Sequence, residues 1–474
     1  DALIERAGRG TFDLSPQLMK RWTGANLLWF AATTVRKGIL LDSPEILKLA
    51  VDRAAEEIDF LDEGLQKDGS FYQHGHRLYS LGYGRPFVEK TADLMLLLGD
   101  SEYQFSEEKM SVLLYHVLDG ILYMTHKGGA DYAASGREYV RPGALRLGNV
   151  ERALRKLLRI EKMPRKEEIR AFADAIAEQK PCVSGVKYFP DSAFTVGHYG
   201  DVYISFKGTN ATLWEAEIIN GEAVLGYNLS YGTHTTVMTD GDEYETIAPI
   251  WDYARIPGTT APDETDAQFM ARPDWSKRYL TGGAFGGRAF DGKNAVIYES
   301  LTHEGISLTV CAFFTAGGVV ILGNGLKDAQ NRPLTTTVEQ CHLKDGYTFD
   351  GKVLTHGGAI YESLYTDAVL VPEVSHREGK LNRVALLAAD KTVSGDVLTV
   401  TLKKPAGCDS YAYRIAPKEA IGEKFSVIRN DGKIQAIGLP DGGIMAHFYE
   451  NGTLDLGKST VEGRAGDDIF VPGT

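Results

Sequence analysis

Two stretches decide the fold of this chain: Pro164-Arg-Lys-Glu-Glu-Ile-Arg-Ala-Phe-Ala-Asp-Ala-Ile-Ala-Glu178 and, shortly after it, Val202-Tyr-Ile-Ser-Phe206. In the first stretch, Ile169, Phe172 and Ile176 recur at the spacing that places them on one face of a helix. In the second stretch, apolar and polar side chains alternate, as they do in a strand with one buried face. The period changes at about residue 183, so the sequence predicts a helical part followed by a β part.

Before this change, the sequence predicts further helices that are joined by short loops. Ser43-Pro44-Glu45 is an N-cap followed by proline at the first helical position, and apolar residues continue on one face as far as Leu61. Further helices are expected at about 86–98, 106–121 and 150–160. Because short loops join antiparallel neighbours, these helices are expected to stack as helical hairpins.

After the change, alternating runs at 306–314, 319–322 and 397–402 predict a large antiparallel β-sandwich. Turn-forming pairs recur between the runs, namely Asp240-Gly241, Asp291-Gly292, Asn324-Gly325 and Asp345-Gly346. The glycine-rich stretch 282–287 lacks the Lys-Ser/Thr pair of a phosphate-binding loop, so it is also expected to be a turn.

Short strands after Pro417 predict a small terminal β module. The sequence therefore predicts an α+β multidomain chain. It has a helical domain at 1–178, a central antiparallel β-sandwich at 179–417 and a small β domain at 418–474.

The composition narrows the class of protein. The chain has 474 residues, of which 43% are hydrophobic and 24% are charged, as expected of a globular protein with more than one core. A net charge of −13 opposes binding to nucleic acid or to anionic membranes. No apolar run approaches the ~20 residues of a membrane-spanning helix. The four cysteines are widely spaced, which indicates neither a zinc site nor a disulfide framework.

The densest polar segment of the helical part runs from Asp68 to Gly84 and lies between two predicted helices. There His74 and Tyr83 can present an imidazole and a phenol to one substrate. The alternative is an aromatic loop that packs on the helices, and the segment alone leaves both open. His74 and His76 have the spacing of half a metal site, but no third ligand follows at a usual spacing, so we expect no metal there.

A second polar segment, Ser135-Gly-Arg-Glu-Tyr-Val-Arg-Pro142, carries two arginines. Arg137 and Arg141 suit a carboxylate or sulfate, which guanidinium groups bind in a bidentate manner. The alternative is a pair of surface salt bridges. A third segment, Glu215-Ala-Glu217-Ile-Ile-Asn220-Gly-Glu222, opens the β part, and its acids either orient an arginine or histidine or face water.

In this order, these segments resemble polysaccharide lyase family 8, and most closely its chondroitin AC lyase branch. The resemblance runs from Thr23-Gly-Ala-Asn26 to Tyr411-Ala-Tyr-Arg414. The matching motifs between them are Gln73-His74, Tyr83-Gly84, Gly136-Arg137, Arg141-Pro142, Glu217 with Asn220, Glu243-Tyr244 and Trp251-Asp-Tyr-Ala-Arg-Ile-Pro-Gly-Thr-Thr260. By this resemblance, the helical domain is an incomplete α/α toroid.

The resemblance implies a lyase that cleaves a uronic-acid polysaccharide by β-elimination. Asn26 and His74 would hydrogen-bond the uronate carboxylate and disperse the charge that forms on it. Tyr83, its pKa lowered by neighbouring cations, would take the C5 proton and return a proton to the leaving O4. Arg137 would hold the phenolate, with Glu217 as an orienting group. The neighbouring sugar would be bound by Arg141, Asn220 and Trp275.

The resemblance also sets expectations about cofactors and location. Some chondroitin lyases bind calcium near this tryptophan-containing segment; here Asp252 and Asp263 match, but Ala254 stands where another acid would be, so we expect no metal and no other cofactor. Only about 25 residues precede Asn26, so we expect the first helices of the toroid to be missing. The first ten residues are not a signal peptide. Because long acidic polysaccharides occur outside the cytoplasm, we expect a secreted or periplasmic bacterial protein.

Three alternatives remain open at this point. The first keeps the chemistry and changes the substrate to xanthan or another glucuronate-containing glycan. The second is a glycan-binding relative without turnover. The third is a glycoside hydrolase, which needs two carboxylates about 5–10 Å apart across the scissile bond. No acidic pair in the sequence competes with the set centred on Tyr83.

Overall fold

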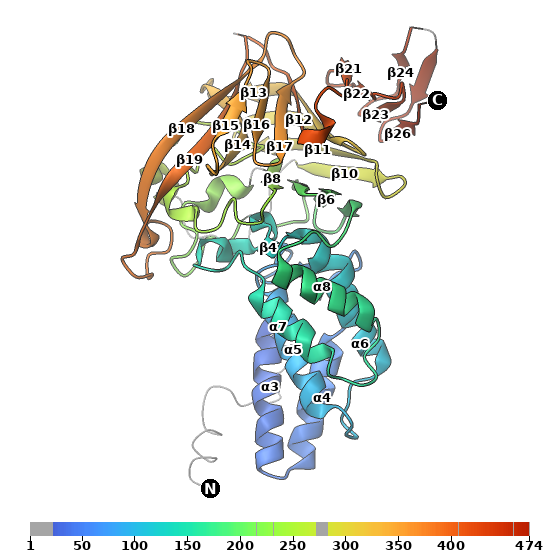
Figure 1. Cartoon of the computed structure of the whole chain (residues 1–474), viewed down its shortest axis with the longest axis vertical. Helices are drawn as coiled ribbons and strands as arrows, with labels where there is room; N and C mark the ends of the chain where they lie inside the picture. The colour runs from blue at the N-terminus through green and yellow to red at the C-terminus, as the bar shows by residue number, and fades with distance from the viewer. Residues whose placement is uncertain are drawn as a thin grey trace. The chain divides into compact units, whose positions relative to one another are not determined.

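The computed structural model describes residues 22–214, 216–230, 232–271, 283–405, 407–457 and 459–473. The chain divides into two compact units. The helical unit extends to Gly136 and includes Ala144–Cys182, and the sandwich unit comprises Arg137–Gly143 and the chain from Val183 onward. The order of a helical part and an antiparallel β part is the predicted one (Figure 1).

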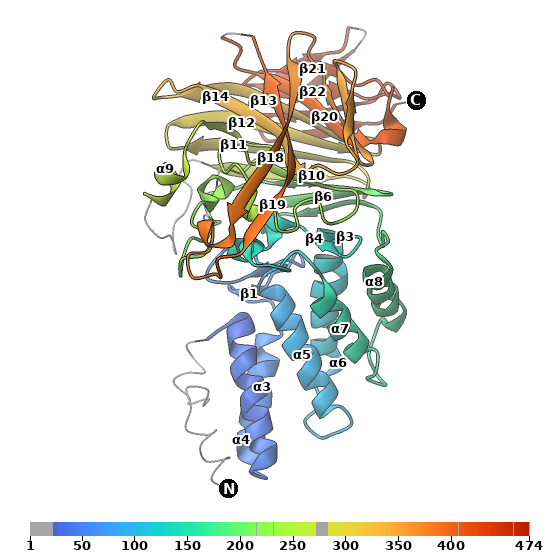
Figure 2. The ribbon, with the colours of Figure 1, turned by 60° about the vertical axis from the view of Figure 1, so that its left-hand side comes forward.

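The helical unit consists of helices joined by short turns and small two-stranded ladders. Its α-helices are α3 (Gly24–Leu40), α4 (Pro44–Glu57), α5 (Gly84–Leu98), α6 (Glu107–Leu114), α7 (Gly148–Leu157) and α8 (Lys166–Glu178). Helices α3 and α4 lie side by side as a hairpin (Figure 2). The predicted N-caps are confirmed, because the Ser43 hydroxyl accepts a hydrogen bond from the Ile46 amide and the Ser106 hydroxyl accepts one from the Lys109 amide.

Helix α3 was not predicted, and the structure shows the reason. Its sequence contains Gly38 near the end, a residue that disfavours helix in isolation. In the fold, a Cβ at Gly38 would lie 2.8 Å from the Leu47 backbone nitrogen, so the glycine lets α3 and α4 approach closely. Tertiary packing therefore stabilises a helix that local propensity does not favour.

The helix predicted from Ser106 ends earlier than expected. α6 stops at Leu114 and continues as a π-helical turn, η1 (Tyr115–Gly120), and then as a short 3-10 helix, η2 (Ile121–Met124). The widened turn accommodates Gly69, whose carbonyl oxygen lies 2.9 Å from His116 Nδ1. A Cβ at Gly120 would lie 2.0 Å from the same oxygen. Among the described residues, no helix is long and apolar enough to cross a membrane.

The sandwich unit is built from antiparallel sheets. The largest has eight strands in the order β10 (Ala284–Ala289), β11 (Ala295–His303), β12 (Ile306–Thr315), β13 (Gly318–Asp328), β20 (Tyr411–Pro417), β17 (Ala359–Ser363), β16 (Val353–His356) and β15 (Tyr347–Phe349). A second sheet has the order β18 (Val369–Lys380), β19 (Thr392–Lys403), β14 (Leu334–His342) and β9 (Thr260–Pro262). A third is β5 (Gly185–Phe189), β6 (Phe194–Tyr199), β7 (Val202–Lys207) and β8 (His234–Met238).

The third sheet is buried more completely than its alternating sequence suggests. Strands β6 and β7 contact β13 and β20 of the eight-stranded sheet, and β8 contacts β14. Polar residues that were expected on an outer face, such as Ser205, are therefore fully buried. Lys207 at the end of β7 is the register partner of His234 at the start of β8, and a long connection joins these two residues.

Two predicted turns are strands instead. Asn324-Gly325 lies inside β13, where the register against β12 shifts between Ser307 and Thr309, so the pair forms a bulge rather than a hairpin turn. Of the glycine-rich stretch, the part from Ala284 onward belongs to edge strand β10. A Cβ at Gly287 would lie 2.3 Å from the Val296 carbonyl oxygen, so the glycine serves close strand packing.

Beyond Pro417 the chain forms a four-stranded sheet and a two-stranded ribbon. The sheet order is β21 (Ser426–Asn430), β22 (Ile434–Gly438), β23 (Ile444–Phe448) and β26 (Asp468–Val471), and the ribbon pairs β24 (Gly452–Asp455) with β25 (Thr460–Gly463). Ile437 and Met445 share a core with Cys311 and Val320 of the eight-stranded sheet. The terminal sheet is thus packed against the sandwich.

Candidate functional site

The helical unit brings His74 and Tyr83 together. Their ring centroids are 4.7 Å apart with an interplanar angle of 64°, an edge-to-face contact. Tyr83 directly precedes α5 and is 8% exposed. His74 has a φ of 57°, a left-handed conformation that is uncommon outside glycine and that collects at functional sites. The predicted imidazole and phenol therefore lie at one place.

Tyr79 packs against both of these rings. Its centroid lies 6.1 Å from His74 and 5.2 Å from Tyr83. Gly136, with a φ of 55°, backs the Tyr79 ring so closely that a Cβ there would lie 2.0 Å from two ring carbons. A glycine is therefore required at 136 both by the conformation and by the space, and it fixes Tyr79 behind the His74–Tyr83 pair.

The backbone around Asn26 is tied to the same loop. Asn26 lies in the first turn of α3, where the Gly24 amide donates to the Glu57 carboxylate and the Ala25 amide donates to Gln73 Oε1 at 3.1 Å. Gly24 has a φ of 57°, and a Cβ there would lie 2.3 Å from Gln73 Oε1. The residue before His74 therefore also caps the helix that carries Asn26.

Glu63 completes this connection, and sequence reasoning did not single it out. Its carboxylate accepts hydrogen bonds from the Gln73 side chain at 2.5 Å and from the amides of His74 and Gly75 at 3.1 and 2.8 Å. The Thr23 hydroxyl donates to it at 2.8 Å. One carboxylate thus holds the strained His74 backbone and the residue before α3. No local motif marks Glu63, because its partners are distant in sequence.

Trp29 is a second residue that was not predicted. It stands one helical turn after Asn26, is 38% exposed, and its ring centroid lies 6.1 Å from that of Tyr83. The spacing from Asn26 was a usable signal, because residues three apart share a helix face. Trp275, the predicted sugar-stacking residue, lies outside the described residues.

The sandwich unit gathers the predicted arginines. Arg137 forms ion pairs with Glu217 through Nη1 and with Glu222 through Nε, the latter at 2.7 Å. Arg141 donates two hydrogen bonds to Glu222, at 2.6 and 2.8 Å, and pairs with Glu138 at 2.9 Å. The side chains of Arg137 and Glu217 are 5% and 2% exposed. Glu217 therefore orients an arginine, which is one of the two roles considered for it.

Glu222 bridges both arginines, although it was not among the predicted site residues. Partial burial opposes its ionisation, but the hydrogen bonds from Arg141 and Arg137 outweigh burial and hold the pKa of Glu222 below its usual value. The same hydrogen bonds raise the pKa of Arg141. Glu222 and Arg141 therefore both stay charged at neutral pH.

Asn220 lies on a tight turn beside this cluster. Asn220 and Gly221 have φ values of 59° and 70°, and the Glu222 amide donates to the Ile219 carbonyl, so the pair forms a type I′ turn. The Leu386 amide donates to the Gly221 carbonyl at 2.8 Å. The exposed Asn220 is therefore carried on a defined turn.

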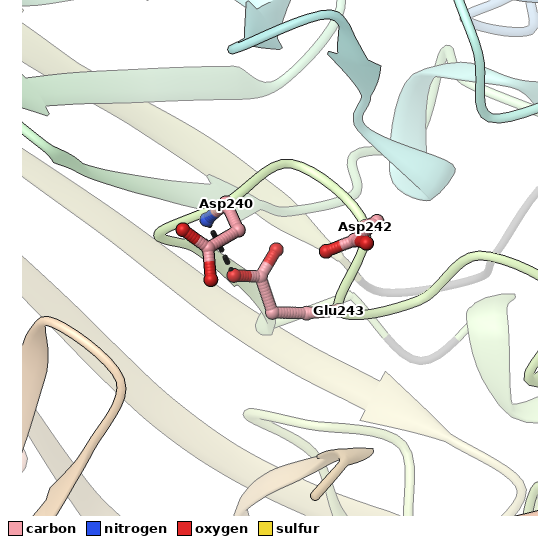
Figure 3. A group of neighbouring side chains, drawn as sticks. All are labelled: Asp240, Asp242 and Glu243. Carbon is pink, nitrogen blue, oxygen red and sulfur yellow. Dashed lines mark hydrogen bonds between the residues drawn. The ribbon is translucent and has the colours of Figure 1, made fainter. Parts of the chain in front are cut away.

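A group of acids follows β8. Carboxylate oxygens of Asp240, Asp242 and Glu243 lie within 4.8 Å of one another (Figure 3). Glu243 accepts the amides of Asp240 and Gly241 at 2.7 and 3.0 Å, and Asp242 forms an ion pair with Lys344. Backbone amides thus bind the Glu243 carboxylate and an ammonium group binds the Asp242 carboxylate.

The two residues considered for calcium have other partners. The Asp252 carboxylate accepts the Ala254 amide at 2.9 Å, and Asp263 forms an ion pair with Arg255. Neither residue belongs to the acidic group around Glu243. The donor set that a calcium ion needs is therefore not assembled from these two residues.

Two family models match the chain. Residues 184–423 match the super-sandwich domain of polysaccharide lyase family 8, and residues 7–178 match the N-terminal alpha-helical domain of the same family. The chondroitinase-AC of Pedobacter heparinus is 26% identical over 97% of this chain and 69% of its own length. The hyaluronate lyase of Thermasporomyces composti is 22% identical over 93% of this chain and 66% of its own length. This chain thus spans about two thirds of the length of these relatives.

Solved structures show the same fold. A chondroitinase AC lyase determined with oligosaccharides covers 100% of this chain and 73% of its own, with a TM-score of 0.84 and 24% identity. A xanthan lyase from Paenibacillus covers 96% of this chain and 50% of its own, with a TM-score of 0.77 and 17% identity. The helical and sandwich matches together span most of the sequence, so this chain belongs to polysaccharide lyase family 8, a family of enzymes that act on polysaccharides.

Proposed function

We propose that this chain cleaves a uronic-acid glycosaminoglycan of the chondroitin or hyaluronan type by β-elimination. The observation that carries the proposal is the edge-to-face contact of His74 and Tyr83, in a loop whose backbone is tied to the helix of Asn26. The names of two relatives, a chondroitinase-AC and a hyaluronate lyase, support this class of substrate. The products are a shortened chain and an unsaturated uronate.

In the proposed reaction, Tyr83 is the base and the acid. The phenolate oxygen removes the C5 proton, the electrons of that bond form the C4–C5 double bond, and the C4–O4 bond breaks. The same phenol then gives its proton to the leaving O4. Asn26 and His74 hydrogen-bond the uronate carboxylate, which carries the extra charge before O4 leaves.

The arginine cluster supplies a fixed guanidinium group in this proposal. Arg137 favours the phenolate and the developing charge on O4, and Glu217 keeps its guanidinium oriented. Arg141, Asn220 and Trp275 bind the neighbouring sugar. The reaction as proposed is performed by side chains and assigns no step to a cofactor. We further propose that the protein acts on its acidic polysaccharide outside the bacterial cytoplasm, where such polymers occur.

The test is an absorbance assay near the ultraviolet edge with chondroitin, hyaluronan and xanthan as separate substrates. Elimination creates an absorbing double bond, hydrolysis does not, and a protein that only binds glycans gives no product. The substrate that yields the signal identifies the glycan, and xanthan as the sole substrate would change the proposed substrate class.

Tyr83→Phe is expected to remove the signal while glycan binding remains, because the phenyl ring keeps the contact with His74 but has no ionisable oxygen. Tyr115→Phe is the matched control, since its hydroxyl bonds the Lys67 carbonyl elsewhere in the helical unit. Full activity in Tyr83→Phe would exclude Tyr83 as the base.

A further inference from the structure

A long connection in the sandwich unit carries the acids of the arginine cluster. It leaves β7 after Lys207 and returns to β8 at His234, two residues that are register partners in the sheet. Glu217, Asn220 and Glu222 all lie on this connection, which we name the 208–233 segment. Long connections without a sheet of their own need a separate means of fixing their position.

One buried carboxylate holds both ends of this segment. Glu299 lies on β11 and is 0% exposed. Its Oε1 accepts the Thr209 amide at 2.8 Å, and its Oε2 accepts the Thr233 amide at 2.9 Å. The two oxygens of a single side chain therefore join the first and the last turn of the segment.

The local sequence is adapted to this contact. Gly232 has a φ of 68°, and a Cβ there would lie 2.2 Å from Glu299 Oε1. A Cβ at Gly208 would lie 2.1 Å from the Phe285 ring. Both glycines therefore let the ends of the segment approach β10 and β11. At the start of the segment, Lys207 Nζ donates a hydrogen bond to the Gly208 carbonyl at 2.5 Å.

We propose that Glu299 is a positioning residue: by joining Thr209 to Thr233 it sets the place of Glu217 and Glu222, and through them the orientation of Arg137 and Arg141. In this role Glu299 acts through the backbone of the segment and touches no substrate. The expected effect on catalysis rests on the proposed function. The expected effect on the position of the 208–233 segment rests only on the hydrogen bonds from the Thr209 and Thr233 amides to Glu299.

The experiment compares Glu299→Gln with Glu339→Gln. A glutamine amide has one acceptor oxygen, so one of the two backbone amides loses its partner. Glu339 is an equally buried carboxylate in the same unit, but it accepts the hydroxyls of Tyr244 and Tyr361, each at 2.8 Å. It therefore controls for the loss of a buried carboxyl group without touching the segment.

Two readouts are measured on the full chain. In Glu299→Gln, we expect amide hydrogen exchange across residues 209–233 to become roughly tenfold faster, and kcat on the cleaved glycan to fall about 10- to 100-fold with KM within about threefold. In Glu339→Gln, we expect exchange in this segment and kcat to stay within about twofold of the wild type. Unchanged exchange, or faster exchange with unchanged kcat, would overturn the positioning role.

A second variant covers the case in which Glu299→Gln does not fold. Gly232→Ala places a methyl group too close to the Glu299 carboxyl group. Gly325→Ala is its control: Gly325 has a φ of 70° and nothing within 4 Å of its Cβ position, so the substitution introduces only backbone strain. The exchange and kcat effects are expected in the first variant and not in the second, and equal effects in both would contradict the inference. A wild type without lyase activity would instead refute the proposed function, and the exchange data would still decide whether Glu299 holds the segment.

Discussion

The aromatic cluster of the helical unit and the charged cluster of the sandwich unit are held by different forces. Around His74 and Tyr83 the contacts are ring against ring, and the backbone is fixed by Glu63 and Gln73. Around Arg137 the contacts are charge against charge, in a chain of ion pairs that runs to Arg141. This difference matches the roles proposed for the two clusters. Tyr83, which is proposed to lose and regain a proton, lies among weakly polar aromatic rings. The groups that must keep their charge are each paired with an opposite one.

The largest expected effect comes from breaking the charged cluster. Arg137→Ala removes the buried cation that pairs with Glu217 and one of the two arginines that contact Glu222, which should destabilise the sandwich unit by about 3–5 kcal/mol. If Arg137 stabilises charge in the transition state, kcat should also fall by at least about 100-fold. Steady-state kinetics with Arg137→Lys as the charge-preserving control measures this. A rise in KM alone would make Arg137 a substrate clamp.

The aromatic cluster should respond to a single methyl group. Gly136→Ala places a Cβ against the Tyr79 ring, so the ring must move and disturb both His74 and Tyr83. We expect kcat to fall by about 10- to 100-fold, because small displacements of reacting groups are costly. Gly143→Ala is the control, since it has a φ of 74° but nothing within 4 Å. Equal losses in both variants would show that backbone strain, and not Tyr79, is responsible.

A smaller effect is expected where the charged cluster reaches solvent. Glu222→Gln weakens the hydrogen bonds to both arginines, and the Arg141 side chain is already 41% exposed. We therefore expect KM to rise about three- to tenfold, with a smaller change in kcat. Glu138→Gln, which removes only one partner of Arg141, should change KM less. The reverse order would show that Glu138 and not Glu222 holds Arg141.

The smallest effect on activity is expected from two buried groups that alter stability only. The pH dependence of their contributions to stability should have opposite signs in the two units. Burial lowers the pKa of His116 in the helical unit to about 4, so its contribution is complete above pH 6.5 and is lost as the pH falls. Burial raises the pKa of Glu339 in the sandwich unit to about 7, against the hydrogen bonds of Tyr244 and Tyr361. Its contribution is therefore complete below pH 4.5 and is lost as the pH rises.

Thermal unfolding across this range tests both signs. Glu339→Gln should remove a decline of roughly 5–10 °C in Tm between pH 4.5 and 7, and His116→Gln should remove a decline of similar size between pH 6.5 and 4. Neither substitution should alter kcat at neutral pH. An unchanged pH slope in either variant would contradict the corresponding assignment.

The parts of the fold that were predictable depend on nearby residues. The caps at Ser43 and Ser106 are hydrogen bonds to residues three positions on, so the sequence reveals them directly. Helix α3 and the bulge at Asn324-Gly325 depend on packing partners from other elements, and both were missed or misassigned. The alternation in β7 was recognised, but its full burial follows from a neighbouring sheet that no local pattern shows.

Among the candidate site residues, too, some were recognisable from the sequence and others only from the structure. His74 and Tyr83 stand in one segment with conspicuous residue types, and the structure places their rings in contact. Glu63 is an acid without a motif, and only the folded chain shows that it holds His74. Glu222 belongs to a segment whose acids were considered as partners of an arginine, but only the folded chain shows that it bridges two of them. The catalytic roles of Asn26, Tyr83 and Arg137 stay predictions.

The paired ends of the 208–233 segment also bear on how such a protein diversifies. A chain that leaves and re-enters a sheet at register partners can change in length without altering the pairing of the two strands. The entropy of closing a longer excursion grows only with the logarithm of its length, so insertions there are thermodynamically cheap. A natural or engineered variant can therefore lengthen the exposed start of this segment near Ala211 while Glu217 and Glu222 keep their arginine partners.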